Sequence, residues 1–201
     1  MARNKYLDAR CILILGGNTE IVKTVAALLA SNGAIVFLAA ENEFTLNASL
    51  QHIRKQVPGC YIIGTTADTT DPNDISRFFL KAEIALPINQ ALIYFFEDTV
   101  NNQDFLTASD RLFKSMINHQ GGQIIIIGDD NAMETKAAAN LNELVETMHR
   151  CFNKFAINTT LLSLHPWSKI IKTKPGIFAK SRSDSIAEKV LVLLTSYILR
   201  Q

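Results

Sequence analysis

The sequence predicts a single α/β domain built on an open, doubly wound parallel sheet with helices on both faces. Short apolar runs rich in β-branched residues alternate with helical patterns along the whole chain of 201 residues. Runs such as Ile124–Ile127 are apolar at successive positions, as expected when helices cover both faces of a parallel sheet. No repeat or linker divides the chain, so we expect one domain over residues 1–201.

Six strands are expected, because each of six short segments is apolar and is bounded by turn residues. In chain order they cover Cys11–Leu15, Ala34–Ala39, Cys60–Thr65, Ala91–Phe96, Gln123–Ile127 and Thr159–Leu164. Right-handed crossovers between successive parallel strands would then produce the open sheet.

Helices are expected between these strands, where apolar residues recur three and four positions apart. They cover Thr19–Ser31, Glu43–Gln56, Pro72–Ala85, Asp104–His119, Met133–Phe155 and Asp184 to the end. Turn residues agree with these boundaries: Ser31-Asn-Gly33 and Gly121-Gly122 follow helices, and Pro58-Gly59 precedes a strand. Asp71-Pro72 is typical of an N-cap followed by proline at the first helical position.

Composition excludes several classes of protein. Hydrophobic residues make up 48% and charged residues 19%, which suits a soluble domain with a large core. A net charge of +1 provides no general attraction to nucleic acid or to a membrane surface, so neither partner is expected. Cys11, Cys60 and Cys151 lie in or beside apolar runs, and we interpret them as reduced core residues of a cytoplasmic protein. No His/Cys cluster predicts a metal site.

Five segments carry a family resemblance through their order and spacing. They are Leu15-Gly-Gly-Asn-Thr-Glu-Ile-Val22 after the first strand, Asn32-Gly-Ala-Ile-Val-Phe37 in the second, Ala67-Asp-Thr-Thr-Asp-Pro72 after the third, Gly121-Gly-Gln-Ile-Ile-Ile-Ile127 in the fifth, and Glu134-Thr-Lys-Ala-Ala-Ala139 in the helix that follows. Together they resemble the short-chain dehydrogenase/reductase (SDR) family over nearly the whole chain. The resemblance implies a Rossmann-type fold, an NAD(P) cofactor and oxidoreductase chemistry.

The first turn departs from the family pattern T-G-x-x-x-G-x-G. Gly16 matches the first glycine, but Glu20 and Val22 occupy the other two glycine positions. A carboxylate ~4 Å from a phosphate costs roughly 4 kcal/mol at an effective dielectric near 20. The attraction of a helix N-terminus for anions returns only ~0.3–1 kcal/mol. We therefore expect no cofactor, unless Glu20 turns away from the site.

Several residues are candidates for cofactor contacts if a dinucleotide does bind. In the first turn they are Gly16, Gly17, Asn18 and Thr19. Asn18 and Thr19 could equally cap the helix. An acidic residue after the second strand, Glu41, favours NAD over NADP, although it could be a solvated loop carboxylate. By the resemblance Asp68 contacts adenine, and its alternative role is a loop cap. Tyr94-Phe-Phe-Glu97 stands where the family has small polar residues, which indicates a filled core.

The catalytic residues of the family are largely missing. Lys136 matches the family's lysine, but the tyrosine four residues earlier is Ala132, so we interpret Lys136 as vestigial. A positioned proton-transfer group typically contributes ~10²–10⁴-fold to the rate, and none replaces the tyrosine here. Asp129, and His165 beyond the sixth strand, are the candidates for a rearranged active site.

The sequence therefore predicts a degenerate SDR-like protein that lacks standard dehydrogenase activity and acts in binding or assembly. The alternatives are an NAD(P)-dependent oxidoreductase with a rearranged active site, and a nucleotide- or phosphate-sensing domain. The last would use the Gly16-Gly17 turn and the basic loop over residues 166–182, which could bind an anionic ligand or simply aid solubility.

A homodimer is the expected assembly. The helices over residues 104–119 and 133–155 carry large apolar residues, and the corresponding helices of the family form a two-fold interface. The same residues could instead cover the chain's own sheet.

Overall fold

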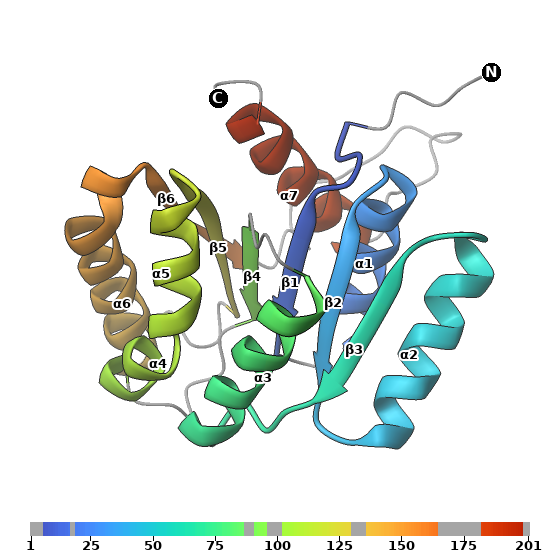
Figure 1. The fold of residues 1–201 in the computed structure, drawn as a ribbon, viewed down its shortest axis with the longest axis horizontal. Coiled ribbons are helices and arrows are strands. Elements are labelled where there is room, and N and C mark those ends of the chain that lie inside the picture. The colour runs from blue at the N-terminus through green and yellow to red at the C-terminus, as the bar shows by residue number, and fades with distance from the viewer. Residues whose placement is uncertain are drawn as a thin grey trace, which may run out of the picture.

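A computed structural model describes residues 6–16, 19–86, 91–95, 102–129, 136–164 and 182–198. Its centre is one sheet of six parallel strands in the order β3-β2-β1-β4-β5-β6 (Figure 1). The strands are β1 Cys11–Leu15, β2 Ile35–Ala40, β3 Ile62–Thr66, β4 Ala91–Phe95, β5 Gly122–Asp129 and β6 Ile157–Leu164. The predicted Rossmann-type fold is confirmed.

Helices cover both faces of this sheet. They are α1 Glu20–Ser31, α2 Glu43–Gln56, α3 Pro72–Ala85, α4 Asn102–Ala108, α5 Asp110–Asn118, α6 Lys136–Phe152 and α7 Arg182–Ile198, with a short 3-10 turn at Asn153–Phe155. One face is covered by α1, α2 and α7, and the other by α3, α4, α5 and α6 (Figure 1).

The apolar side chains of each strand divide between two cores. In β1, Ile12 and Ile14 enter the core under α1, α2 and α7, whereas Leu13 and Leu15 enter the core on the opposite face. Alternate residues of a strand point to opposite faces, so a strand buried on both faces must be apolar at every position. This explains the uninterrupted apolar runs in the sequence.

Local hydrogen bonds fix the helix starts that the sequence predicted. Helix α3 begins at Pro72, and the Oδ1 atom of Asp71 accepts the backbone N–H of Asn73 at 2.8 Å. Helix α2 begins with a capping box between Asn42 and Thr45. Both caps satisfy N–H groups that lack a partner within the helix.

The predicted helix Asp104–His119 is wrong as one continuous element, because the chain forms α4 and α5 with a break at Ser109. Ser109 has a ψ of 1°, away from helical geometry, and it is fully buried. The hydrogen bonds from Ser109 N to Phe105 O and from Phe113 N to Ser109 O continue through the break. Apolar spacing alone therefore did not reveal the change of direction.

The prediction that all three cysteines are core residues is wrong for Cys151. Cys11 is buried, and burial raises the pKa of its thiol, but Cys60 is only partly buried and Cys151 is exposed. The buried stripe of α6 continues from Met148 to Phe152, whose ring lies 4.2 Å from that of Phe113. Cys151 lies beside that stripe rather than on it.

Replacing Phe105 should destabilise the protein strongly, because its 1% exposed ring stacks on Tyr94 with the centroids 4.3 Å apart. We expect Phe105→Ala to lower the free energy of unfolding by about 3–5 kcal/mol in urea denaturation. Phe44, which is 83% exposed, provides the matched control, and Phe44→Ala should change stability by less than about 0.5 kcal/mol. Equal losses in the two variants would contradict this packing.

Candidate functional site

The carboxyl ends of the strands bring most of the candidate residues to one edge of the sheet. Gly16 follows β1, Glu41 follows β2, Asp68 lies just beyond β3, and Asp129 ends β5. This edge lies at the bottom of the sheet in Figure 1. Ligands of open α/β sheets bind outside the carboxyl ends of the strands, so this edge is the candidate site.

Close packing between neighbouring strands requires glycine at position 16. Its φ is +98°, a region that L side chains rarely adopt, and an added Cβ would lie 2.5 Å from the carbonyl oxygen of Phe95. The backbone of β4 therefore excludes any side chain here. Gly16 therefore has a structural role that is independent of a cofactor.

The start of α1 satisfies its own hydrogen bonds and packs its own side chains. Thr19 is the N-cap, and its side chain accepts the N–H of Val22 at 3.4 Å. Val22 is 2% exposed and belongs to the core under α1, α2 and α7. The cap that the sequence suggested for Thr19 is present, whereas Gly17 and Asn18 lie outside the described residues.

Glu20 points into solvent at the first turn of α1. Its side chain is 68% exposed, and its carboxylate lies 3.8 Å from the Nζ atom of Lys23. Such an exposed pair contributes about 0–1 kcal/mol, and solvent weakens the repulsion that the carboxylate exerts on an approaching phosphate. The repulsion between Glu20 and a dinucleotide phosphate is therefore smaller than the ~4 kcal/mol that applies to two like charges ~4 Å apart.

Asp68 is held by the loop that follows β3. Its Oδ1 atom accepts both the N–H and the hydroxyl of Thr70, at 2.7 and 2.6 Å, and its own N–H donates to Asp74. The Thr70 hydroxyl, followed by the Thr70 N–H, lowers the pKa of Asp68. One carboxylate oxygen is thus already committed to the loop-cap role. Glu41 is exposed beside Asn42, the N-cap of α2.

Aromatic side chains fill the core beside the end of β4. Tyr94 is 1% exposed and stacks almost parallel on Phe105, with an interplanar angle of 8°. Phe95 is buried in the core on the other face of the sheet. Tyr94 and Phe95 therefore pack as the filled core that the sequence indicated, while Phe96 and Glu97 lie outside the described residues.

The proposed catalytic residues are located only through their backbone. Asp129 pairs in register with Leu164 at the end of β6, and Lys136 is the first residue of α6. Both residues belong to segments near the carboxyl edge of the sheet, and the structure describes their backbone but not their side chains. Ala132, His165 and the basic loop from 166 to 181 also fall outside the described residues.

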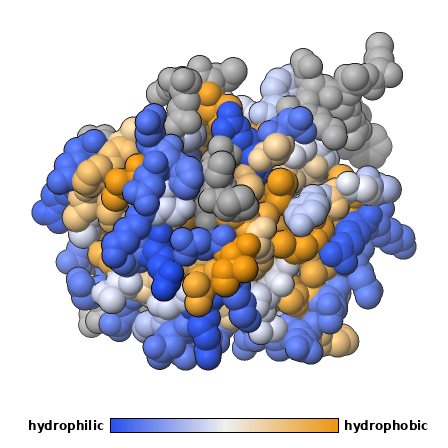
Figure 2. Space-filling view, viewed as in Figure 1, coloured by the Kyte–Doolittle hydropathy of each residue, from blue (hydrophilic) through white to orange (hydrophobic). Residues whose placement is uncertain are grey.

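The helices predicted to form a dimer bury most of their large apolar residues in the chain's own core. These residues are Phe105, Leu112, Phe113, Met116, Leu141, Leu144 and Met148. Figure 2 shows a mostly hydrophilic surface along α5, and hydrophobic residues gather instead over α3, where Leu80 and Ile84 are exposed. The buried residues thus serve the one-sided packing that the sequence left open.

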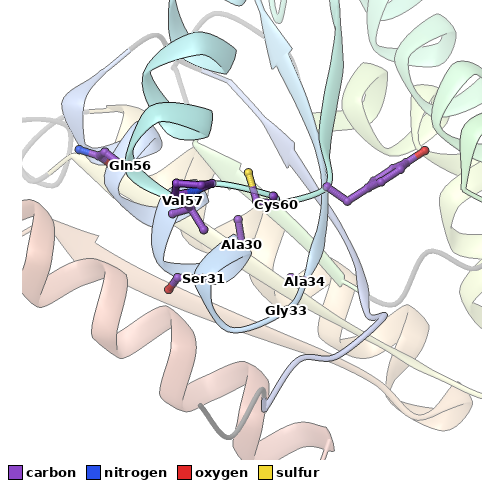
Figure 3. A pocket seen from close by; sticks show the side chains of 10 residues that line it. Ala30, Ser31, Gly33, Ala34, Gln56, Val57 and Cys60 are labelled. Carbon is purple, nitrogen blue, oxygen red and sulfur yellow. The ribbon is translucent and has the colours of Figure 1, made fainter. Parts of the chain in front are cut away.

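Sequence reasoning missed a cavity of about 420 Å³ at the opposite, amino edge of the sheet. Figure 3 shows it between the end of α1, at Ala30 and Ser31, and the end of α2, at Gln56 and Val57. Cys60 also lines it, and burial raises the pKa of this thiol. The turns Ser31-Asn-Gly33 and Pro58-Gly59 mark this edge in the sequence, but they do not reveal a hollow.

The described residues contain no helix long and apolar enough to span a lipid bilayer. No group of three or more His, Cys, Asp or Glu side chains in the same part of the chain could hold a metal ion.

Comparison with known proteins identifies the fold. No family model and no curated protein matches the sequence. A hydroxysteroid dehydrogenase from Escherichia coli is 21% identical, with a TM-score of 0.74 over 94% of this chain and 91% of that one. A metagenomic short-chain oxidoreductase in complex with NADP is 20% identical, with a TM-score of 0.75 over 94% and 92%.

A 7α-hydroxysteroid dehydrogenase, solved with NADH and 7-oxo glycochenodeoxycholic acid, is 21% identical, with a TM-score of 0.68 over 80% of this chain and 72% of that one. At these identities the likeness concerns the fold, and the chain has the fold of the short-chain dehydrogenases/reductases.

The Gly16 contact predicts a large difference between two glycine substitutions. Gly59 also has a positive φ, +77°, but a Cβ there would meet nothing within 4 Å. Gly59→Ala should therefore cost about 1 kcal/mol of stability from the backbone alone. Gly16→Ala should cost about 1–3 kcal/mol more in urea denaturation, because it adds the clash with Phe95. Similar costs would argue against the close approach of β4.

The loop around Asp68 predicts a pKa change that NMR titration can follow. Thr70→Val removes the hydroxyl donor and should raise the pKa of Asp68, whereas Thr70→Ser should preserve it. Because the native pKa is lowered, the stabilisation is present above the ordinary pKa of aspartate and is lost as pH falls through the lowered value. An unchanged pKa in Thr70→Val would rule out this bond.

Proposed function

We propose that this chain is a non-catalytic protein with the SDR fold, which acts by binding or assembly rather than by hydride transfer. The stacked pair of Tyr94 and Phe105 is the observation that carries the proposal. The SDR pattern has small polar residues beside the cofactor at the end of the fourth strand. In this chain the fourth strand, β4, ends in buried aromatic side chains. Buried aromatic rings in place of small polar residues would leave less room for a ribose or adenine, which supports the proposal.

The first turn supports the same proposal. The N–H of Val22 already bonds to Thr19, and the valine side chain packs against the sheet. A dinucleotide needs free N–H groups and close backbone approach at this position. Binding in the usual manner would therefore require this turn to rearrange.

The chemistry of the sequence adds a separate argument. Alanine at position 132 cannot exchange a proton, and without an acid/base group a carbonyl reduction loses ~10²–10⁴-fold in rate. Lys136 alone supplies a positive charge but no substitute for the phenol. The aromatic packing at Tyr94 and the missing proton donor at position 132 thus both support a non-catalytic protein.

An NAD(P)-dependent oxidoreductase with a rearranged site is the second candidate. Two of the similar structures contain NADH or NADP. Exposed carboxylates at Glu41 and Asp68 could meet a ribose or an adenine at the same edge. On this reading NAD is favoured over NADP, since Glu41 would repel a 2′-phosphate.

Thermal unfolding with NAD, NADH, NADP and NADPH separates these candidates. A ligand at 100 times its dissociation constant adds about 2.7 kcal/mol of stability, or roughly 5–10 °C for a chain of this size. The proposal expects no shift with any of the four. A shift of that size with one dinucleotide would overturn it and support the oxidoreductase.

Introducing the two missing glycines of the SDR first-turn pattern, at positions 20 and 22, provides the matched experiment. The Glu20→Gly and Val22→Gly double variant tests whether the first turn alone prevents binding, and Val22→Ala controls for lost packing. Val22→Gly itself should lower stability, by about 1 kcal/mol from helix propensity and a further 1.5–3 kcal/mol from lost burial. Continued absence of binding in the folded double variant would point to the aromatic packing at Tyr94.

A further inference from the structure

Strand β3 has a helix over only one of its two faces. Ile62 points into the core under α1, α2 and α7, whereas Ile63 is only partly buried beside the core of the opposite face. Because side chains alternate along a strand, Tyr61 lies on the same face as Ile63. On that face α3 lies next to β3, and it packs on β2 through the rings of Phe78 and Phe37, whose centroids are 5.3 Å apart. Figure 1 shows β3 beside α3, with no described helix in front of the strand.

Large apolar side chains are exposed where α3 meets the uncovered face of β3. Helix α3 runs back along the sheet from the carboxyl end of β3, so its last turn lies toward the amino end of that strand. Ile84 is 78% exposed, Tyr61 is 57% exposed, and Leu80 is exposed as well. Figure 2 shows hydrophobic residues gathered over this region. We call the surface formed by Tyr61, Ile63, Leu80 and Ile84 the β3 face. Exposed apolar patches often mark sites where a partner protein binds.

The β3 face has the width of one helix. Neighbouring helices in a layer lie about 8–10 Å apart, and neighbouring strands lie about 4.8 Å apart. Because α3 packs on β2, the next helix in the same layer would lie over β3 and its outer edge. An extended strand fits less well, since it would need the backbone groups of that edge. The carbonyl of Ile62 there already accepts a hydrogen bond from the guanidinium of Arg54 at 2.9 Å.

Cationic side chains lie on both sides of the β3 face. Lys81 of α3 donates from its Nζ atom to the Thr65 hydroxyl at 2.8 Å, and Arg54 lies at the outer edge of the strand. Neither base forms an ion pair within the described part of the chain. The two acids of α3, Asp74 and Glu83, pair with other bases. Acidic groups that approach the β3 face would therefore meet a positive charge on each side.

We propose that the β3 face binds an amphipathic helix of a partner protein, with its apolar stripe on the β3 face and acidic residues beside Lys81 and Arg54. Binding of this kind uses apolar side chains three and four positions apart as anchors. A second copy of α3 is a less suitable occupant, because its own Lys81 would approach Lys81 and Arg54. The charges thus favour a different, acidic helix.

This inference rests on the proposed binding function and identifies a surface for it. The two can fail separately, because a dinucleotide would bind at the carboxyl ends of the strands and the helix would bind on the β3 face. A stability shift with a dinucleotide would contradict the non-catalytic function, and it would not change the binding of a helix. Absent helix binding would contradict the role of the β3 face, and it would leave the dinucleotide result as it is.

NMR titration of the full chain with a synthetic helical peptide tests the β3 face. The probe has about 18 residues, since shorter helices are marginal in water, with leucines three and four positions apart and glutamates on both sides of that stripe. We expect a dissociation constant of about 100 μM or lower, with the largest shifts at the amides of the β3 face. A matched peptide with lysine in place of every glutamate should bind about tenfold more weakly.

Substitutions in the chain locate the contact. Ile84→Ser should raise the dissociation constant of the glutamate peptide about tenfold, because it removes an exposed apolar anchor. Phe44→Ala, at an exposed position on α2, is the matched control and should leave binding unchanged. Lys81→Glu combined with Arg54→Glu should reverse the preference, so that the lysine peptide binds more tightly. If the double variant fails to fold, Lys81→Glu alone should abolish the preference for the glutamate peptide.

Three results would overturn the proposal. The first is no binding of the glutamate peptide up to about 1 mM, which corresponds to only ~4 kcal/mol of binding free energy. The second is binding that Ile84→Ser and Lys81→Glu leave unchanged, which would place the peptide on another surface. The third is self-association of the native chain that Ile84→Ser abolishes in sedimentation, because a second copy would then occupy the β3 face.

Discussion

The parallel pairing of β1 with β4 at the centre of the sheet is the constraint on which the rest of the structure depends. The chain direction across the sheet reverses here, since β2 and β3 lie on one side of β1 and β5 and β6 lie beyond β4. The backbone at Gly16 approaches the Phe95 carbonyl too closely for any side chain. That approach fixes where β1 ends, where α1 can begin, and how the two faces of the sheet receive their helices.

The carboxyl edge at this pairing is where ligands of open α/β sheets bind, and its described residues make contacts within the fold. Thr19 caps α1, Val22 fills a core, and Asp68 accepts bonds from its own loop. Each of these residue types could also contact a dinucleotide. The role of each residue here is therefore decided by the contacts that it makes and not by its residue type. The fold is that of the short-chain dehydrogenases, and fold alone supplies no chemistry.

Most of the elements could be predicted because local signals and long-range packing agree. The boundaries of α2 and α3 follow from their caps and from the residues after them, and β1 follows from five consecutive apolar residues. The break at Ser109 and the exposure of Cys151 could not be predicted. Both depend on which side of a helix meets the sheet, and apolar spacing defines a stripe without defining the direction of its axis.

By itself the sequence determined the order of strands and helices, the burial of the sheet on both faces and the loss of the tyrosine at position 132. Periodicity and residue chemistry suffice for these features, because they act over a few neighbouring positions. Only the tertiary structure decided that Gly16 is required by Phe95, that Tyr94 stacks on Phe105, and that Arg54 bonds the Ile62 carbonyl in the edge strand β3. These features arise from contacts between segments far apart in the chain, where distance and direction decide what a residue does.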